Sequence, residues 1–190
     1  MNQEPSPSLN LRTDADLVIN EDTIDDAIRD IATRLNRHFG QSQFSHQNIV
    51  AYCIMNGGLY FSGQLLRYLD FPLQLSYLHA TRYGNNTTGS DLKWHTRPNP
   101  KTIHNAHILL MDDIFDEGLT LEAIDKECRE LGAKSVHSVV LTDKQHPRKP
   151  KSGFKPDFIG LEVDDRYIFG CGMDYQGLYR NLPEIYALKP

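Results

Sequence analysis

Three aspartates, a glycine and a threonine lie close together in the middle of the chain and have the chemistry to bind a phosphorylated sugar. Asp112 and Asp113 follow an apolar run, Asp116 comes three residues later, and Gly118 and Thr120 complete the segment. A tight turn that leads into a helix offers converging N–H groups and partial positive charge to an anion. Because the carboxylates would repel a phosphate, hydroxyl groups and a divalent cation should lie between them, and Mg²⁺ prefers such oxygen ligands. The pattern therefore predicts a ligand that carries a phosphate, hydroxyl groups and Mg²⁺, such as a ribose phosphate.

The residues around this segment predict the strand, the turn and the helix that must position it. Ile108–Met111 is continuously apolar, which is typical of a strand buried on both faces of a parallel sheet. From Leu119 onward, apolar residues recur at spacings of three and four, as they do in a helix. Gly118 permits the positive φ or the close backbone approach that a tight turn needs. We therefore expect a ligand site at the carboxyl end of a strand, with Thr120 either capping the helix or binding a phosphate oxygen.

Strand and helix patterns alternate along the rest of the chain. Such alternation favours right-handed βαβ units, and hence an α/β fold with a parallel sheet flanked by helices. Residues 1–16 are expected to form a loose N-terminal arm and residues 17–190 a single domain, a length that can bury a sizeable core. Helices are expected at Glu21–Phe39 and Leu59–Leu69, and strands at Asn48–Ile54, Leu73–Leu78, Val136–Leu141, Asp157–Val163 and Tyr167–Phe169.

Composition limits the classes of protein and of partner. Hydrophobic residues make up 39% of the 190 residues and charged residues 24%, as in ordinary globular proteins. A formal net charge of −5 argues against nucleic acid as the main partner. No apolar run approaches the roughly 18 residues of a membrane span, and Met1–Asn10 lacks the pattern of a signal peptide. Three widely spaced cysteines without zinc-binding spacing favour reduced thiols and a cytoplasmic location.

Two parts of the chain resemble phosphoribosyltransferases. Over 108–120, the order of four apolar residues, two acids, two apolar residues, Asp, any residue, Gly, any residue and Thr resembles the phosphoribosyl-pyrophosphate (PRPP) motif of the type I family. The C-terminal part resembles hypoxanthine-guanine phosphoribosyltransferases, and the likeness extends from about Asn48 to Leu188. The stretches that carry it are Pro156-Asp157-Phe158-Ile159-Gly160, Gly170-x-x-x-Asp174-Tyr175 and Tyr179-Arg180-Asn181-Leu182-Pro183.

This resemblance implies a fold and an activity. The type I phosphoribosyltransferase fold has a parallel central sheet flanked by helices, a small hood and a flexible lid loop. The implied reaction is a step of purine salvage, in which a 6-oxopurine base, hypoxanthine or guanine, takes the phosphoribosyl group of PRPP and pyrophosphate leaves. The products would be IMP or GMP, the implied cofactor is Mg²⁺, and the implied assembly is a homodimer or homotetramer.

The resemblance also implies roles for the residues that bind PRPP. Asp112 and Asp113 would hold the ribose hydroxyls, directly or through metal-bound water. Asp116 would be the general base for the purine. The loop that binds the 5′-phosphate would be formed by Asp116, Glu117, Gly118, Leu119 and Thr120. The pyrophosphate would be contacted by Asn56, Gly57 and Arg180. Many relatives have Thr in place of Glu117 and Lys in place of Asn56, so Glu117 is expected to turn outward and a charged contact is missing at Asn56.

Further residues are implied for the purine and for the lid. Lys144 would donate to the purine O6, a contact that selects 6-oxopurines over adenine. Tyr167 would stack on the purine face, and Ile168 would offer backbone groups to the base edge. Asp174 would bind a second Mg²⁺ and help to read guanine. The lid would lie in the polar segment His79–Pro100, with Arg82 and Tyr83 near its start, and would shield the reacting carbon from water.

Other interpretations of the sequence remain open. A PRPP- or nucleotide-binding regulator could use the same fold without catalysis. A receiver-like signalling domain also has an acidic pair at a strand end, but there the pair follows the first strand. The segment His79–Pro100 could be a solvated hairpin, and the basic segment His146–Pro156 is expected to be a surface turn. The pair His104 and His107 has a spacing that straddles a strand start, so it is a weak candidate for metal binding.

Overall fold

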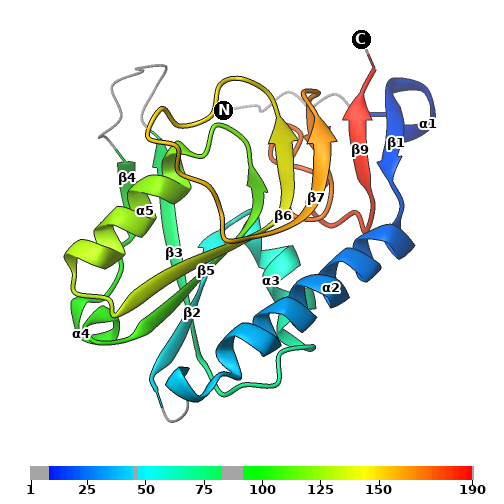
Figure 1. Ribbon diagram of the computed structural model, residues 1–190. Helices are drawn as coiled ribbons and strands as arrows, with labels where there is room; N and C mark the ends of the chain where they lie inside the picture. The colour runs from blue at the N-terminus through cyan, green and yellow to red at the C-terminus, as the bar shows by residue number, and fades with distance from the viewer. Residues whose placement is uncertain (1–8, 45–46, 83–91, 190) are drawn as a thin grey trace.

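A six-stranded sheet forms the centre of the molecule (Figure 1). The computed structural model describes residues 9–44, 47–82 and 92–189. All neighbouring pairs are parallel except β3 and β4, which are antiparallel, so the predicted parallel α/β sheet is confirmed. The strands, in spatial order, are β4 (Leu92–Thr96), β3 (Gln74–Arg82), β2 (Ile49–Met55), β5 (His107–Phe115), β6 (Ser135–Gln145) and β7 (Phe158–Asp164).

Helices cover both faces of this sheet (Figure 1). On one face, α2 (Glu21–Phe39) and α3 (Gly58–Leu66) pack into a core with β2, β5 and β6. On the other face, α4 (Pro100–Ile103) and α5 (Leu119–Glu130) close a second core. The predicted bounds of α2 are confirmed, since a buried stripe that includes Ile24, Ile28 and Ile31 faces the sheet and Asn20 caps the helix. Among the described residues, none of the helices is both long and apolar enough to cross a membrane.

A small antiparallel sheet stands beside the end of the large one (Figure 1). Its strands, in order, are β1 (Ala15–Ile19), β9 (Ile185–Leu188) and β8 (Ile168–Phe169), and α1 (Leu11–Asp14) precedes it. It corresponds to the expected hood. The expected loose arm is wrong for its last residues, because buried Ala15 pairs with Leu188 and Asp16 forms an ion pair with Arg166 at 2.6 Å. Residues 1–8 of that arm lie outside the described residues.

Strand β5 is longer than the sequence predicts. It continues beyond the apolar run to Phe115, because β6 remains its partner through the pairs Ile114–Thr142 and Phe115–Asp143. On its other side, the last pair with β2 is Cys53–Met111. The acidic pair therefore lies within a strand that has lost one neighbour, at the carboxyl edge of the sheet where ligands bind.

The expected lid segment contains regular structure at both of its ends. Strand β3 runs on to Arg82, and β4 returns beside it with the pairs Ala80–Trp94 and Thr81–Lys93. The hairpin interpretation therefore fits the described ends of this segment. Tyr83 and the rest of 83–91, where the tip of the predicted lid falls, lie outside the described residues. A short 3₁₀ helix, Ser42–Phe44, completes the described elements.

Candidate active site

A cavity of about 450 Å³ opens at the carboxyl edge of the large sheet. It lies where β2 and β5 end and α5 begins, which is the place where open α/β sheets bind ligands. Every residue that the sequence predicts for PRPP binding lines it. These residues are Asn56, Gly57, Asp112, Asp113, Asp116, Glu117, Gly118, Leu119, Thr120 and Arg180.

The turn between β5 and α5 leaves backbone donors available to this cavity. Gly118 is the N-cap of α5, with a left-handed φ of 74° and no side-chain cap. The first helical hydrogen bond runs from Glu122 N to Gly118 O, so the N–H groups of the preceding first-turn residues are not used within the helix. A Cβ at Gly118 would overlap the ring of Phe115. Thr120 lies inside the helix, so its predicted capping role is wrong, and the alternative of phosphate binding stays a prediction.

The negative charges of Asp112 and Asp113 in β5 are only partly neutralised by the groups around them. Asp113 is buried, and its backbone N–H donates to Asp112 Oδ1 at 3.0 Å. Burial, together with the charge of Asp113, raises the pKa of Asp112 well above its ordinary value. Burial also raises the pKa of Asp113, although the charge of Arg180 opposes the rise. The pair therefore suits a cationic, oxygen-preferring ligand such as Mg²⁺.

The described residues do not form a complete metal site by themselves. No group of three or more His, Cys, Asp or Glu side chains among them is arranged to hold a metal ion. Asp174, the predicted ligand of a second ion, pairs with Arg180 Nη2 at 2.7 Å and accepts from Gly177 N at 2.7 Å. An ion at either place would take most of its ligands from water and from substrate oxygens, as Mg²⁺ usually does.

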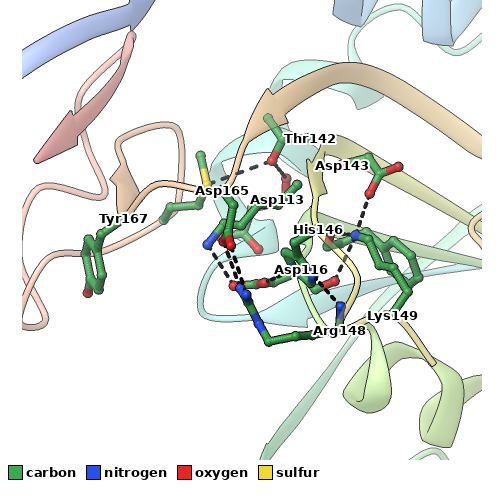
Figure 2. A network of polar contacts seen from close by, with 12 residues as sticks. Asp113, Asp116, Thr142, Asp143, His146, Arg148, Lys149, Asp165 and Tyr167 are labelled. Carbon is green, nitrogen blue, oxygen red and sulfur yellow. Dashed lines mark hydrogen bonds and ion pairs between the residues drawn. The ribbon is translucent and has the colours of Figure 1, made fainter. Parts of the chain in front are cut away.

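Asp116 is the most strongly hydrogen-bonded carboxylate of the predicted motif (Figure 2). Lys144 Nζ donates to its Oδ2 at 2.8 Å, and His146 Nε2 lies 2.6 Å from its Oδ1. Burial alone would raise the pKa of Asp116, but the hydrogen bonds from Lys144 and His146 and the charge of Lys144 outweigh burial and lower it. Asp116 is therefore ionised over a wide pH range and can accept a proton or a hydrogen bond.

The segment that follows β6 holds the loop of residues 116–120 in place, and the sequence did not predict these contacts. Lys149 Nζ donates to the carbonyls of Phe115 at 2.7 Å and Asp116 at 2.9 Å, and pairs with Asp143 at 2.6 Å (Figure 2). The side chain of His146 is fully buried. The expected surface turn is therefore wrong at these two residues. The only signal in the sequence was a concentration of basic residues just beyond a strand end.

The predicted purine-binding residues Lys144, Tyr167, Ile168 and Asp174 do not line this cavity, although Lys144 and Asp174 contact Asp116 and Arg180, which do. Lys144 is buried and reaches it through Asp116. Tyr167 is 52% exposed, and its hydroxyl donates to Asp174 O at 3.1 Å. Ile168 pairs with Ala187 while the neighbouring Tyr167 O accepts from the β9 backbone, so the N–H and C=O of Ile168 point away from β9. Both the exposed ring and these backbone groups are available to a flat base.

The predicted pyrophosphate residues meet at a closely packed crossing of three chain segments. The peptide bond between Met55 and Asn56 is cis. A Cβ at Gly57 would overlap the carboxylate of Asp113, so a larger residue here would displace that carboxylate. Arg180 Nη1 donates to Gly172 O at 2.6 Å, which holds its guanidinium at the cavity wall.

The two histidines considered for metal binding have other contacts. His107 is buried, and its Nδ1 lies 2.7 Å from Ser135 Oγ. His104 lies against Gly132, with Nδ1 where a Cβ on that glycine would fall. Neither belongs to a group of metal-binding side chains within the described part of the chain.

The chain is similar to known phosphoribosyltransferases over most of its length. The family model described as phosphoribosyl transferase domain matches residues 20–176. The hypoxanthine-guanine phosphoribosyltransferase of Bacillus subtilis is 32% identical over 92% of this chain and 93% of its own length. The hypoxanthine-guanine-xanthine phosphoribosyltransferase of Tritrichomonas foetus is 32% identical, with 91% of each chain covered. A crystal structure of a hypoxanthine phosphoribosyltransferase from Staphylococcus aureus superposes with a TM-score of 0.81 at 25% identity, covering 96% of this chain and 98% of that one.

The acidic pair leads to a prediction about stability. Because the folded state raises the pKa of Asp112, its charge destabilises the fold above that pKa, and the effect vanishes when acid protonates the group. Asp112→Asn keeps an oxygen for the Asp113 N–H and should raise the melting temperature at pH 7 by roughly 2–4 °C, as about 1 kcal/mol does in a chain of this size. The gain should shrink as the pH falls. Asp26→Asn on the exposed face of α2 is the control, and a lower melting temperature for Asp112→Asn would contradict this account.

Proposed function

This chain belongs to the phosphoribosyltransferase family, with hypoxanthine-guanine phosphoribosyltransferases among its relatives, and on that premise we propose how it transfers the phosphoribosyl group of PRPP to a 6-oxopurine. The products are IMP or GMP and pyrophosphate, and the reaction is a step of purine salvage. The observation that carries the assignment is the meeting of three features in one cavity: an uncapped helix N-terminus, an acidic pair, and a carboxylate held by a lysine.

The 5′-phosphate of PRPP belongs at the start of α5. The free N–H groups of its first turn and the positive end of the helix dipole both favour an anion there. Leu119 and Thr120 line the cavity at this turn, and the hydroxyl of Thr120 adds a donor. Glu117 lines the same cavity, and its negative carboxylate would repel a phosphate. We therefore assign the backbone N–H of Glu117, and not its side chain, to the ligand.

The ribose and the pyrophosphate extend from this turn toward β2. Asp112 and Asp113 would accept hydrogen bonds from the ribose hydroxyls and would hold Mg²⁺, directly or through metal-bound water. When bound, Mg²⁺ neutralises the pyrophosphate and orients it as a leaving group. Arg180 and the backbone of Asn56 and Gly57 face the same part of the cavity and complete the pyrophosphate site. The proposed lid begins after Arg82, the last residue of β3, and its role would be to exclude water from the reacting carbon.

The purine binds between Asp116 and the hood. The bond from C1 of the ribose to the pyrophosphate oxygen breaks, C1 gains positive charge, and a purine nitrogen forms the new bond. Asp116 accepts or shares the proton of the purine imidazole ring, so its ionised state is the one that the reaction needs. Lys144 turns from Asp116 to the purine O6, and this contact selects against adenine.

The hood supplies the face and the edge of the purine site. We assign the stacking contact with the base to exposed Tyr167 and the base-edge contact to the backbone groups of Ile168 that point away from β9, and this exposure and orientation support the assignment. Asp174, which pairs with Arg180, would hold a second Mg²⁺ and help to read the guanine edge.

Transfer is tested by incubating the protein with PRPP, MgCl₂ and hypoxanthine and by measuring IMP. We expect turnover with the wild type, and a decrease in kcat of roughly 10²-fold or more in Asp116→Asn, because a positioned acid–base group is lost. Asp143→Asn, which changes a carboxylate on the far side of Lys149, is the control for loop packing. If the protein binds PRPP but forms no IMP, the result would instead favour the non-catalytic regulator. Wild-type turnover in Asp116→Asn would contradict the role of Asp116 as the general base.

The proposed cellular location is the cytoplasm. Its support is the state of the three cysteines, Cys53, Cys128 and Cys171, all of which are free and buried. Burial raises the pKa of Cys128 and of Cys171 to about 12, so these thiols are protonated and unreactive. A reducing compartment suits a chain that keeps such thiols.

The proposed assembly is a homodimer or homotetramer, with α3 and β3 as the face that a second copy covers. Leu59, Leu75 and Tyr77 are all more than half exposed there, around an apolar cavity of about 400 Å³. Light scattering should give the mass of two or four chains, and Leu75→Glu should shift it toward one. Leu17→Glu on the hood is a matched control, since Leu17 is similarly exposed. A monomeric wild type would contradict the assembly.

A further inference from the structure

Asp116 has a second hydrogen-bonding partner besides Lys144. His146 Nε2 lies 2.6 Å from Asp116 Oδ1, while Lys144 occupies the other oxygen at 2.8 Å (Figure 2). The imidazole is fully buried, whereas the Asp116 side chain is 42% exposed toward the cavity. One oxygen of the carboxylate is therefore held from within the protein, and the exposed side of the group is left for a ligand.

The hydrogen bonds of His146 determine which ring nitrogen carries the proton. The backbone N–H of Arg148 donates to His146 Nδ1 at 3.0 Å, so Nδ1 must present a lone pair. The proton of the neutral ring is then on Nε2 and points at Asp116 Oδ1. The ring is therefore oriented as a donor to Asp116.

The two partners of Asp116 differ in what they can do when a purine enters. Lys144 has a long flexible side chain and can turn to another acceptor. His146 is buried, tied to its own loop, and cannot follow a ligand. If Lys144 leaves for the purine, Asp116 loses the charge of that partner and becomes a better proton acceptor, while His146 keeps its orientation.

Several other charged groups surround this carboxylate. Lys149 binds the main-chain carbonyl of Asp116 and the side chain of Asp143, so its charge is already paired. The guanidinium of Arg148 pairs with both oxygens of Asp165, at 2.7 and 2.8 Å. Glu117 adds a neighbouring negative charge along the loop. Since these basic groups have other partners, Lys144 and His146 are the side chains that hydrogen-bond the Asp116 carboxylate.

We propose that His146 is a positioning residue of the transferase reaction, which holds Asp116 through a fixed Nε2–H donor so that the carboxylate stays aimed at the purine when Lys144 moves to the base. This inference rests on the proposed function and adds to it a residue outside the sequence motif. The residue acts through Asp116 and does not touch the substrate.

Two amide substitutions separate this role from a merely structural one. In His146→Gln, the amide nitrogen can replace Nε2 and donate to Asp116. In His146→Asn, the shorter side chain can accept from Arg148 N but cannot reach Asp116. The two variants therefore share a polar amide, and they differ in the contact that the proposal concerns.

The experiment measures IMP formation by wild type and both variants between pH 5 and 9, after circular dichroism has established that each is folded. We expect kcat to fall about tenfold or more in His146→Asn, as loss of a hydrogen bond to a charged group does, with the KM for PRPP little changed. The acid limb of kcat/KM should move to higher pH, because a lost donor favours protonated Asp116. His146→Gln should restore most of the rate and the wild-type limb.

A second experiment, nuclear magnetic resonance of the imidazole nitrogens, tests the proposal without relying on activity. In ¹⁵N-labelled wild type, the imidazole signals missing from His146→Asn should belong to the tautomer with a proton on Nε2. Wild-type kcat and pH profile in His146→Asn, or a proton on Nδ1, would overturn the proposal. If the wild type forms no IMP, the proposed function fails, and the tautomer still tests the contact with Asp116 separately.

Discussion

The site depends on one backbone constraint, the left-handed conformation of Gly118 against the ring of Phe115. This conformation turns the chain from β5 into α5 within a few residues, and the absence of a Cβ lets the turn pack on the ring. Two consequences follow from the same turn. The first-turn N–H groups of α5 face the cavity, and Asp116 is carried to the edge where β6 and its following loop can hold it.

The electrostatic environments at the two ends of the motif differ, and the difference matches the two roles proposed for the acidic pair and for Asp116. In β5, burial and mutual repulsion raise the pKa values of Asp112 and Asp113, so the pair is stabilised by an incoming cation. Three residues beyond Asp113, hydrogen-bond donors lower the pKa of Asp116, which keeps it ionised before a purine arrives. In the proposed function, this single short segment would serve Mg²⁺ and ribose at one place and a proton at another, with a helix N-terminus for the phosphate beside both.

Features that depend on neighbouring residues could be predicted from the sequence, and features that depend on contacts between distant residues could not. The strand, the turn and α5 were predicted because apolar period, Gly118 and the acid spacing are local signals, and so was the whole of α2. The clamp formed by His146 and Lys149 could not be predicted, since it joins residues about 30 positions apart through the register of β5 and β6. The pairing of Ala15 with Leu188 depends on still more distant parts of the chain. The extension of β5 was missed because charged residues hid a strand that a partner strand sustains.

Calorimetric titration of PRPP in the presence of MgCl₂ into wild type and into Gly118→Ala tests the central claim most directly. Gly153→Ala is a matched control, because Gly153 has a φ of 80° but nothing within 4 Å of an added Cβ. We expect the wild type and Gly153→Ala to bind PRPP alike, and Gly118→Ala to remain folded by circular dichroism but to bind at least about tenfold more weakly, since the loss of a charge-assisted hydrogen bond has about that effect. Equal affinities in all three proteins would contradict the claim that the turn at Gly118 forms the phosphate site.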